Sequence, residues 1–150
     1  MCSNIVYVAE SDEEISLCFP AYKELRTHLT EEHSFIQQVR RQQEYGFKLI
    51  FIKNSKAVVA CAGYRFLETL AWGKIIYIDD LVTKEEARGN GYGSGLLRYI
   101  DEQAKIHQCN EVHLDTGYHR HSAHRVYLRH GFQLNCHHFS KVPHSETIKD

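Results

Sequence analysis

A glycine-rich run between a strand pattern and a helix pattern constrains this chain more than any other feature. Residues 88–95 read Arg-Gly-Asn-Gly-Tyr-Gly-Ser-Gly. The preceding residues, 74–83, are rich in β-branched side chains and predict a strand, whereas apolar residues at helical spacing predict a helix over 91–107. A glycine turn lets a ligand approach the backbone, and the first N–H groups of a helix attract anions. The run therefore predicts an anion-binding loop that suits a diphosphate.

Two common phosphate-binding loops do not match this run. A Walker loop needs a Gly-Lys-Ser/Thr ending, which is absent. In the dinucleotide fingerprint Gly-x-Gly-x-x-Gly, the third glycine is missing whether the count starts at Gly89 or at Gly91. The pattern that fits is Arg-x-x-Gly-x-Gly, at Arg88, Gly91 and Gly93. It resembles the acyl-CoA-binding motif of the GNAT superfamily of N-acyltransferases. The alternative is a surface turn that only begins a helix.

A second segment, residues 123–132, resembles a later motif of the same superfamily. There, Ala123 and Tyr127 are four residues apart and share one face of a predicted short helix. Gly131 supplies the helix stop, and the Phe after it opens a predicted strand. The two motifs occur in the family's order and cover about residues 75–135 together.

Length, charge and cysteine use favour a small intracellular protein. The chain has 150 residues and a net charge of −1 at pH 7. Its length fits one domain, residues 1–150, and its charge implies no general attraction to nucleic acid or to an anionic membrane. No apolar run reaches the length of a membrane span. The five cysteines are scattered without a Cys-x-x-Cys pair, which suits a reducing compartment. We therefore expect a cytoplasmic location.

Hydrophobic periodicity and turn residues predict a mixed α/β fold. Ser11 and Glu14 form a capping-box signature, Pro20 should kink the first helix or split it, and Thr30 is expected to cap the second. The expected elements are a strand at 5–8, helices at 11–25 and 31–45, strands at 47–53, 57–67 and 74–83, a helix at 91–107, a strand at 111–116, a helix at 120–130 and a strand at 132–142.

The order of these elements matches the GNAT order except at its end. The resemblance implies a central mixed sheet with an antiparallel N-terminal half and helices on both faces. The strands before and after the glycine loop, joined through a helix, should be parallel. Family members usually finish with two strands, and this chain has room for one, at 132–142. A homodimer in which a second chain covers that edge is therefore one expectation.

The resemblance also implies which residues bind the donor, acetyl-CoA. Backbone N–H groups of the loop would hold its pyrophosphate, and the end of the preceding strand would line its pantetheine arm. Arg88 would either add charge near the phosphates or only cap the loop. The implied donor-binding residues are Leu81, Val82, Thr83, Arg88, Gly89, Asn90, Gly91, Tyr92, Gly93 and Ser94.

Three residues are candidates for proton transfer. Asp79 and Asp80 lie mid-strand, where carboxylates are unusual, and strand alternation places them on opposite faces. One could face the cleft and deprotonate an ammonium substrate; Asp79 is slightly preferred because it shares the more polar face. The alternative is that both pair with nearby cations. Tyr127 stands where the family motif places the acid that protonates the leaving CoA thiolate, a role that its phenol suits.

Histidines are crowded towards the C-terminal end, which raises the alternative of a metal site. The strict zinc spacings are absent, and acyl transfer needs no metal, so we expect none. The interpretation that we favour is a cationic surface that includes His119, Arg120 and Arg125 and holds an anionic group of the substrate or of the cofactor. The family more often has Asn where Arg120 stands.

The most specific function that the sequence predicts is N-acetyl transfer. Acetyl-CoA would be the donor and a small-molecule or protein primary amine the acceptor, by direct attack in a ternary complex. Cys109 and Cys136 have no nucleophile context, which argues against an acyl-cysteine route. The walls of the acceptor site would come from residues 11–46. The alternative is a non-catalytic acyl-CoA sensor or a regulatory dimer module on the same fold.

Overall fold

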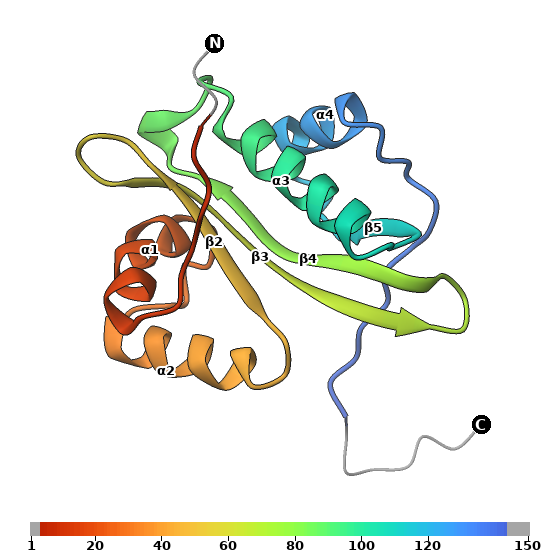
Figure 1. The fold of residues 1–150 in the computed structure, drawn as a ribbon, viewed down its shortest axis with the longest axis horizontal. Coiled ribbons are helices and arrows are strands. Elements are labelled where there is room, and N and C mark those ends of the chain that lie inside the picture. Colours follow the sequence, from red (N-terminus) through yellow and green to blue (C-terminus); the bar gives the residue numbers. More distant parts are fainter. Residues whose placement is uncertain (1–3, 144–150) are drawn as a thin grey trace. The chain divides into compact units, whose positions relative to one another are not determined.

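A five-stranded mixed sheet forms the centre of the first part of the chain, residues 1–114 (Figure 1). The structure is a computed structural model that describes residues 4–143, and its second part, residues 115–150, is considered separately. The strands follow the order β1 (Tyr7–Val8), β2 (Lys48–Lys53), β3 (Val58–Thr69), β4 (Gly73–Thr83) and β5 (Glu111–Leu114). Strands β1 to β4 pair antiparallel, and β4 pairs with β5 in parallel. The predicted mixed α/β sheet with an antiparallel N-terminal half is confirmed.

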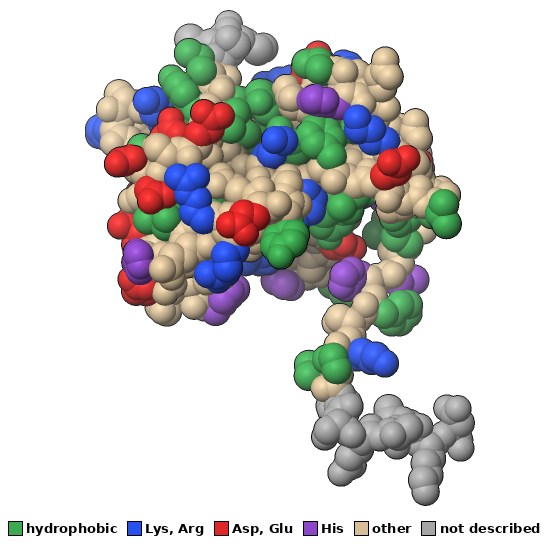
Figure 2. Space-filling view, turned by 60° about the horizontal axis from the view of Figure 1, so that its bottom comes forward, with side chains coloured by type: hydrophobic (Ala, Val, Ile, Leu, Met, Phe, Trp, Pro, Cys, Tyr) green, Lys and Arg blue, Asp and Glu red, His purple; other side chains and the backbone are tan. Residues whose placement is uncertain are grey.

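Helices cover both faces of this sheet, as expected. Figure 1 shows α1 (Asp12–Leu25) and α2 (Glu32–Gln43) on one face and α3 (Tyr92–Ile106) on the other. The apolar stripe of α3 is buried, and it consists of Leu96, Leu97, Ile100 and Ala104. None of the helices within residues 4–143 is both long and apolar enough to cross a membrane. Acidic and basic side chains are interspersed on the face shown in Figure 2.

Local capping explains where the first two helices begin. Ser11 accepts a hydrogen bond from the Glu14 N–H, and the Glu14 carboxylate accepts from the Ser11 N–H, so the predicted capping box is confirmed. Pro20 lies inside a single continuous helix rather than between two pieces. The expectation that Thr30 caps α2 is wrong. The N-cap is Glu31, whose carboxylate accepts hydrogen bonds from the His33 and Ser34 N–H groups of the first turn.

A β-bulge interrupts the β3–β4 ladder at Asp79. Gly63 is paired with Asp80, whereas the next residue of β3, Tyr64, is paired with Ile78. Asp79 is therefore an extra residue in β4. A bulge of this kind bends the strand, increases its twist and breaks the simple alternation of side chains.

In the second part of the chain, the structure describes one helix, α4 (His121–Arg129), and no strand between residues 115 and 143. The helix ends before Gly131, whose φ of 85° lies in the left-handed region, as its predicted role as a helix stop requires. The predicted strand at 132–142 is wrong. Leu134 and Phe139 are 89% and 91% exposed, and β-propensity alone does not hold a strand without a paired and packed partner.

Candidate active site

The glycine loop joins β4 to α3 through a short 3-10 helix, η1 (Glu85–Ala87). Gly91 is the N-cap of α3, and both Gly89 and Gly91 have positive φ values, 82° and 77°. Among the described residues, nothing lies within 4 Å of a Cβ built on either one. Glycine is therefore needed here for its backbone conformation, and the space in front of the loop is open. A Cβ on Gly93 would meet only the Thr83 Oγ1, at 3.7 Å.

Side chains of the loop brace its own backbone. The Asn90 side chain donates to the Ala87 carbonyl at 2.9 Å, so this residue holds the turn in shape. Arg88 is exposed, and its Nε approaches the Thr83 carbonyl at 3.4 Å. The helix that follows presents its first-turn N–H groups, including those of Tyr92 and Gly93, at the positive end of the helix dipole. The loop thus has the geometry of an anion site.

The end of β4 next to this loop is paired on only one side within residues 4–114. Its pairing with β5 stops at Ile78 and Leu114, whereas its pairing with β3 continues to Thr83. Val82 is buried in the core, and Leu81 and Thr83 are half-buried. The strand therefore offers backbone donors and acceptors from Leu81 to Thr83 to an extended ligand, while the Val82 side chain packs in the core.

Both aspartates of β4 turn to the sheet face that carries α1 and α2. Asp80 accepts hydrogen bonds from Tyr22 and Arg26 of the α1 end. Asp79 accepts from Arg65 Nε at 3.0 Å, and the same guanidinium donates to Gln42 of α2. The expectation that the two carboxylates point to opposite faces is wrong, because the extra residue of the bulge shifts the alternation. Both are paired with an arginine, which is the alternative considered above.

Asp80 is the more enclosed of the two carboxylates. Its side chain is 14% exposed, and Oδ1 accepts from Arg26 Nε at 3.0 Å and from Nη2 at 2.6 Å. Oδ2 accepts from the Tyr22 hydroxyl at 3.3 Å. Burial raises the pKa of Asp80, and the Arg26 guanidinium opposes that rise. Burial also raises the pKa of the Tyr22 phenol, which stays protonated as a donor.

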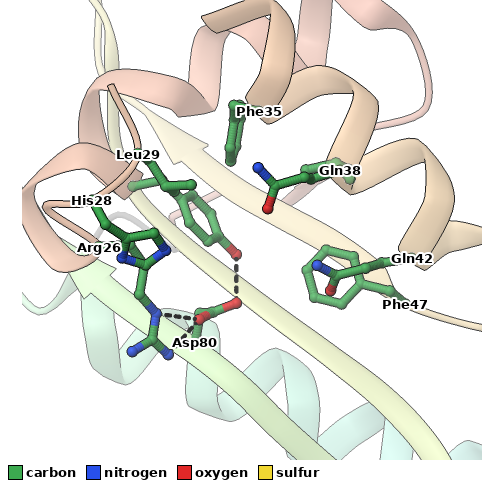
Figure 3. Close-up of a pocket in the computed structure, with 10 residues that line it drawn as sticks. Arg26, His28, Leu29, Phe35, Gln38, Gln42, Phe47 and Asp80 are labelled. Carbon is green, nitrogen blue, oxygen red and sulfur yellow. Dashed lines mark hydrogen bonds and ion pairs between the residues drawn. The ribbon is translucent and has the colours of Figure 1, made fainter. Parts of the chain in front are cut away.

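Asp80 lies at the floor of a pocket of about 140 Å³ between the sheet and the two N-terminal helices (Figure 3). Its walls come almost entirely from residues 22–47. The lining residues are Tyr22, Arg26, His28, Leu29, Phe35, Gln38, Val39, Gln42, Phe47 and Asp80. Asp79, the residue slightly preferred from the sequence, is not among them. Sequence reasoning missed Arg26; its spacing of four residues from Tyr22, on one helix face, was the available signal.

The remaining predicted site residues lie in the second part of the chain. Tyr127 is half-buried on α4, and its ring packs against Phe132 with 5.7 Å between centroids. Burial raises the pKa of Tyr127, and the nearby Arg120 opposes the rise. Arg120 is the N-cap of α4, whereas His119 and Arg125 are exposed. Their roles in acid catalysis and anion binding stay predictions.

Two histidines in the second part of the chain interact with nearby residues of that part. His124 contacts the Gly117 carbonyl at 2.9 Å, and His138 lies 3.4 Å from the Asp115 carboxylate. Within residues 4–143, no cluster of three or more His, Cys, Asp or Glu side chains is arranged to hold a metal ion.

Comparison with known proteins shows that the sequence of this chain is similar to those of acetyltransferases. A family model described as the Acetyltransferase (GNAT) family matches residues 9–132. An uncharacterized N-acetyltransferase of Bacillus subtilis, YhdJ, is 32% identical over 133 residues, which cover 87% of this chain and 93% of that protein. An aminoalkylphosphonate N-acetyltransferase of Salmonella typhimurium is 36% identical over 65 residues, 43% of this chain and 42% of that protein.

Solved structures show the same fold at lower identity. A transcriptional regulator from Bacillus halodurans aligns with a TM-score of 0.82 and 21% identity, covering 93% of this chain and 99% of its own. An acetyltransferase from Trypanosoma brucei aligns with a TM-score of 0.77 and 17% identity, with the same coverage of each chain.

Proposed function

Because this chain belongs to the GNAT acetyltransferase family, we propose that it transfers an acetyl group from acetyl-CoA to a primary amine. The observation that carries the proposal is the open glycine loop at the N-terminus of α3, next to a β4 end that is paired on one side. The loop would hold the pyrophosphate, and Leu81 to Thr83 would bond the pantetheine arm through their backbone. The thioester would then lie near the bulge, where β4 leaves β5.

The pocket above Asp80 is the proposed acceptor site. Asp80 would take a proton from the incoming ammonium group, directly or through water, because its raised pKa brings it nearer to a useful base. Arg26 would hold the carboxylate in place. Within the described residues Oδ2 has only the 3.3 Å contact with Tyr22, so it is the oxygen better placed to accept the proton. A relative named for acetylating aminoalkylphosphonates supports an amine as the acceptor class.

The reaction would proceed in one ternary complex. The amine nitrogen attacks the thioester carbonyl carbon, a C–N bond forms, and the C–S bond breaks as CoA thiolate leaves. The thiolate would take its proton from Tyr127, whose phenol is kept protonated to high pH by burial. After the attack the nitrogen would lose its second proton through water to the Tyr127 phenolate, which leaves a neutral amide and restores the phenol. Asp80, by then protonated, returns its proton to solvent.

Acetyl-CoA turnover with a panel of amines, followed by release of free thiol, tests this function. Turnover with at least one amine is the expected result. Tight binding of acetyl-CoA without turnover of any amine would instead identify a sensor. Absence of acetyl-CoA binding by the folded protein would contradict both functions.

A further inference from the structure

The charges of the pocket above Asp80 are already neutralised by pairs. Arg26 pairs with Asp80 at 2.6 Å, and behind the pocket Arg65 pairs with Asp79. Among the ten residues that line the pocket, these pairs leave the amides of Gln38 and Gln42 and the imidazole of His28 as the other polar groups. The rest of the wall is aromatic or aliphatic, from Tyr22, Leu29, Phe35, Val39 and Phe47.

A second charge on the acceptor would therefore find no counter-ion at the wall. In a diamine, one amino group would use Asp80, and the second ammonium group would find no other carboxylate among the residues that line the pocket. A phosphonate would bring its negative charge towards a guanidinium that is bound to Asp80 and to the Asp79 carbonyl. Removing such a charge from water without a partner is strongly unfavourable. An uncharged body avoids this cost and buries apolar surface against the rings.

Gln38 is the wall residue best placed to hydrogen-bond a polar group of the acceptor. Gln42, one turn later on α2, is held by Arg65 Nη2 at 3.2 Å from its Oε1. Within the described residues, no hydrogen bond of the Gln38 side chain is found, and Figure 3 shows its amide pointing into the pocket. Gln38 also lines a shallow outer hollow with Arg41, Gln42 and Tyr45, so a longer acceptor would pass it on the way out.

We propose that this pocket selects a primary amine whose remaining part is uncharged and partly apolar, and that Gln38 is the residue that determines this specificity. The inference rests on the proposed acetyl transfer and deepens it by naming the acceptor class. Gln38 would donate to or accept from a neutral polar group of the acceptor, while Phe35 and Phe47 pack against its apolar part.

Three amines test the proposal: tyramine, whose phenol is an uncharged polar group on an apolar ring, 1,4-diaminobutane and 2-aminoethylphosphonate. The wild-type protein should show the highest kcat/KM with tyramine. Gln38→Glu should raise the kcat/KM of the diamine relative to the phosphonate, and Gln38→Lys should do the reverse, each on the order of tenfold for one charge added at the pocket wall. Both variants keep a long polar side chain at a position that makes no side-chain hydrogen bond to the part of the chain that the structure describes, so folding should be preserved.

The matched control is Gln37→Glu, the same chemical change at an exposed neighbouring position that does not line the pocket. It should leave the ratio of the three amines unchanged. A wild-type preference for the diamine or the phosphonate overturns the inference and leaves acetyl transfer intact. Equal effects of Gln37→Glu and Gln38→Glu overturn the role of Gln38. Failure of every amine in a protein that binds acetyl-CoA overturns the acetyl transfer on which the inference rests.

Discussion

Gly63 lies directly opposite Asp80 in the β3–β4 ladder, and its missing side chain makes room for the pocket wall. A Cβ at Gly63 would lie 2.4 Å from two atoms of the Phe47 ring and 2.9 Å from the Tyr22 hydroxyl oxygen. Both of those groups line the pocket, and Tyr22 also bonds Asp80. The ring, the phenol and the carboxylate can therefore converge only because the strand carries no side chain at this point.

Gly63→Ala should damage the proposed acceptor site and spare the proposed donor site. The added methyl group forces the Phe47 ring and the Tyr22 hydroxyl to move, which should lower the free energy of unfolding by about 1–3 kcal/mol. The KM for the amine should rise, while the affinity for acetyl-CoA stays near that of the wild type. Steady-state kinetics with each substrate varied in turn, together with urea unfolding, would check this. An unchanged amine KM would show that this pocket does not bind the acceptor.

Gly93→Ala should separate ligand binding from stability at the glycine loop. The new Cβ makes only an ordinary contact with the Thr83 Oγ1, and alanine is the better helix former, so the unfolding midpoint should stay equal or rise. The affinity for acetyl-CoA should nevertheless fall, by about tenfold or more, because the methyl group takes space next to the diphosphate.

Gly91→Val makes an informative contrast to that variant. Its left-handed φ of 77° disfavours any side chain, so both stability and acetyl-CoA affinity should fall together. Calorimetric binding and thermal unfolding of the two variants would distinguish these patterns. Undiminished acetyl-CoA affinity in folded Gly93→Ala would contradict the assignment of the loop.

Tyr127→Phe should lower kcat by about 10²–10⁴-fold if the phenol protonates the leaving thiolate. Phenylalanine keeps the ring that packs against Phe132 and removes only the hydroxyl, so acetyl-CoA affinity should barely change. Burial raises the pKa of Tyr127, so the wild-type kcat should stay high through alkaline pH until the phenol ionises above its ordinary value. If Tyr127→Phe has a kcat near that of the wild type, another group or water protonates the leaving thiolate.

Asp80 should make the free energy of unfolding depend on pH in the direction opposite to that of an ordinary ion-paired aspartate. Because burial raises its pKa in the folded state above the ordinary value of 3.8, the folded chain holds this proton to higher pH than the unfolded chain. The stabilising contribution of Asp80 is therefore fully present below the ordinary pKa of 3.8, and it is lost as the pH rises through the raised pKa of the folded state.

Urea unfolding of the wild type and of Asp80→Asn across acidic pH would measure this contribution. The free energy of unfolding of the wild type minus that of the variant should decrease as the pH rises. A difference that grows with pH would mean that attraction to Arg26 outweighs burial. In the acetylation assay, Asp80→Asn should lower kcat/KM for the amine, because an amide cannot accept the ammonium proton.

Motif spacing and hydrophobic periodicity were sufficient to predict the layers and the glycine turn that begins α3. The strand, glycine turn and helix around Gly91 are encoded locally, by residues that are neighbours in the chain. Strand alternation failed at Asp79, because a bulge is decided by how β4 pairs with β3 and not by the residues of β4 alone. The strand at 132–142 failed for a related reason, since apolar residues in alternation do not supply a partner strand.

The pocket could be foreseen only in outline. Residues 11–46 were expected to form its walls, but no sequence pattern links Arg26 to Asp80, which lies more than fifty positions away. A contact of this kind depends on how the end of α1 crosses the sheet. Long-range pairing of single charged residues leaves no periodic trace in one sequence.

The bulge in β4 lies at Asp79, directly after the last residue of β4 that pairs with β5. On either side of Asp79 the ladder is the one that an uninterrupted strand would have, with Ile78 opposite Tyr64 and Asp80 opposite Gly63. Deleting the codon for Asp79 would therefore leave every neighbouring side chain on its present face. It would also straighten β4 at the place where it parts from β5. A shortened chain of that kind should keep its core and lose the open edge that we propose for the long, flexible thioester.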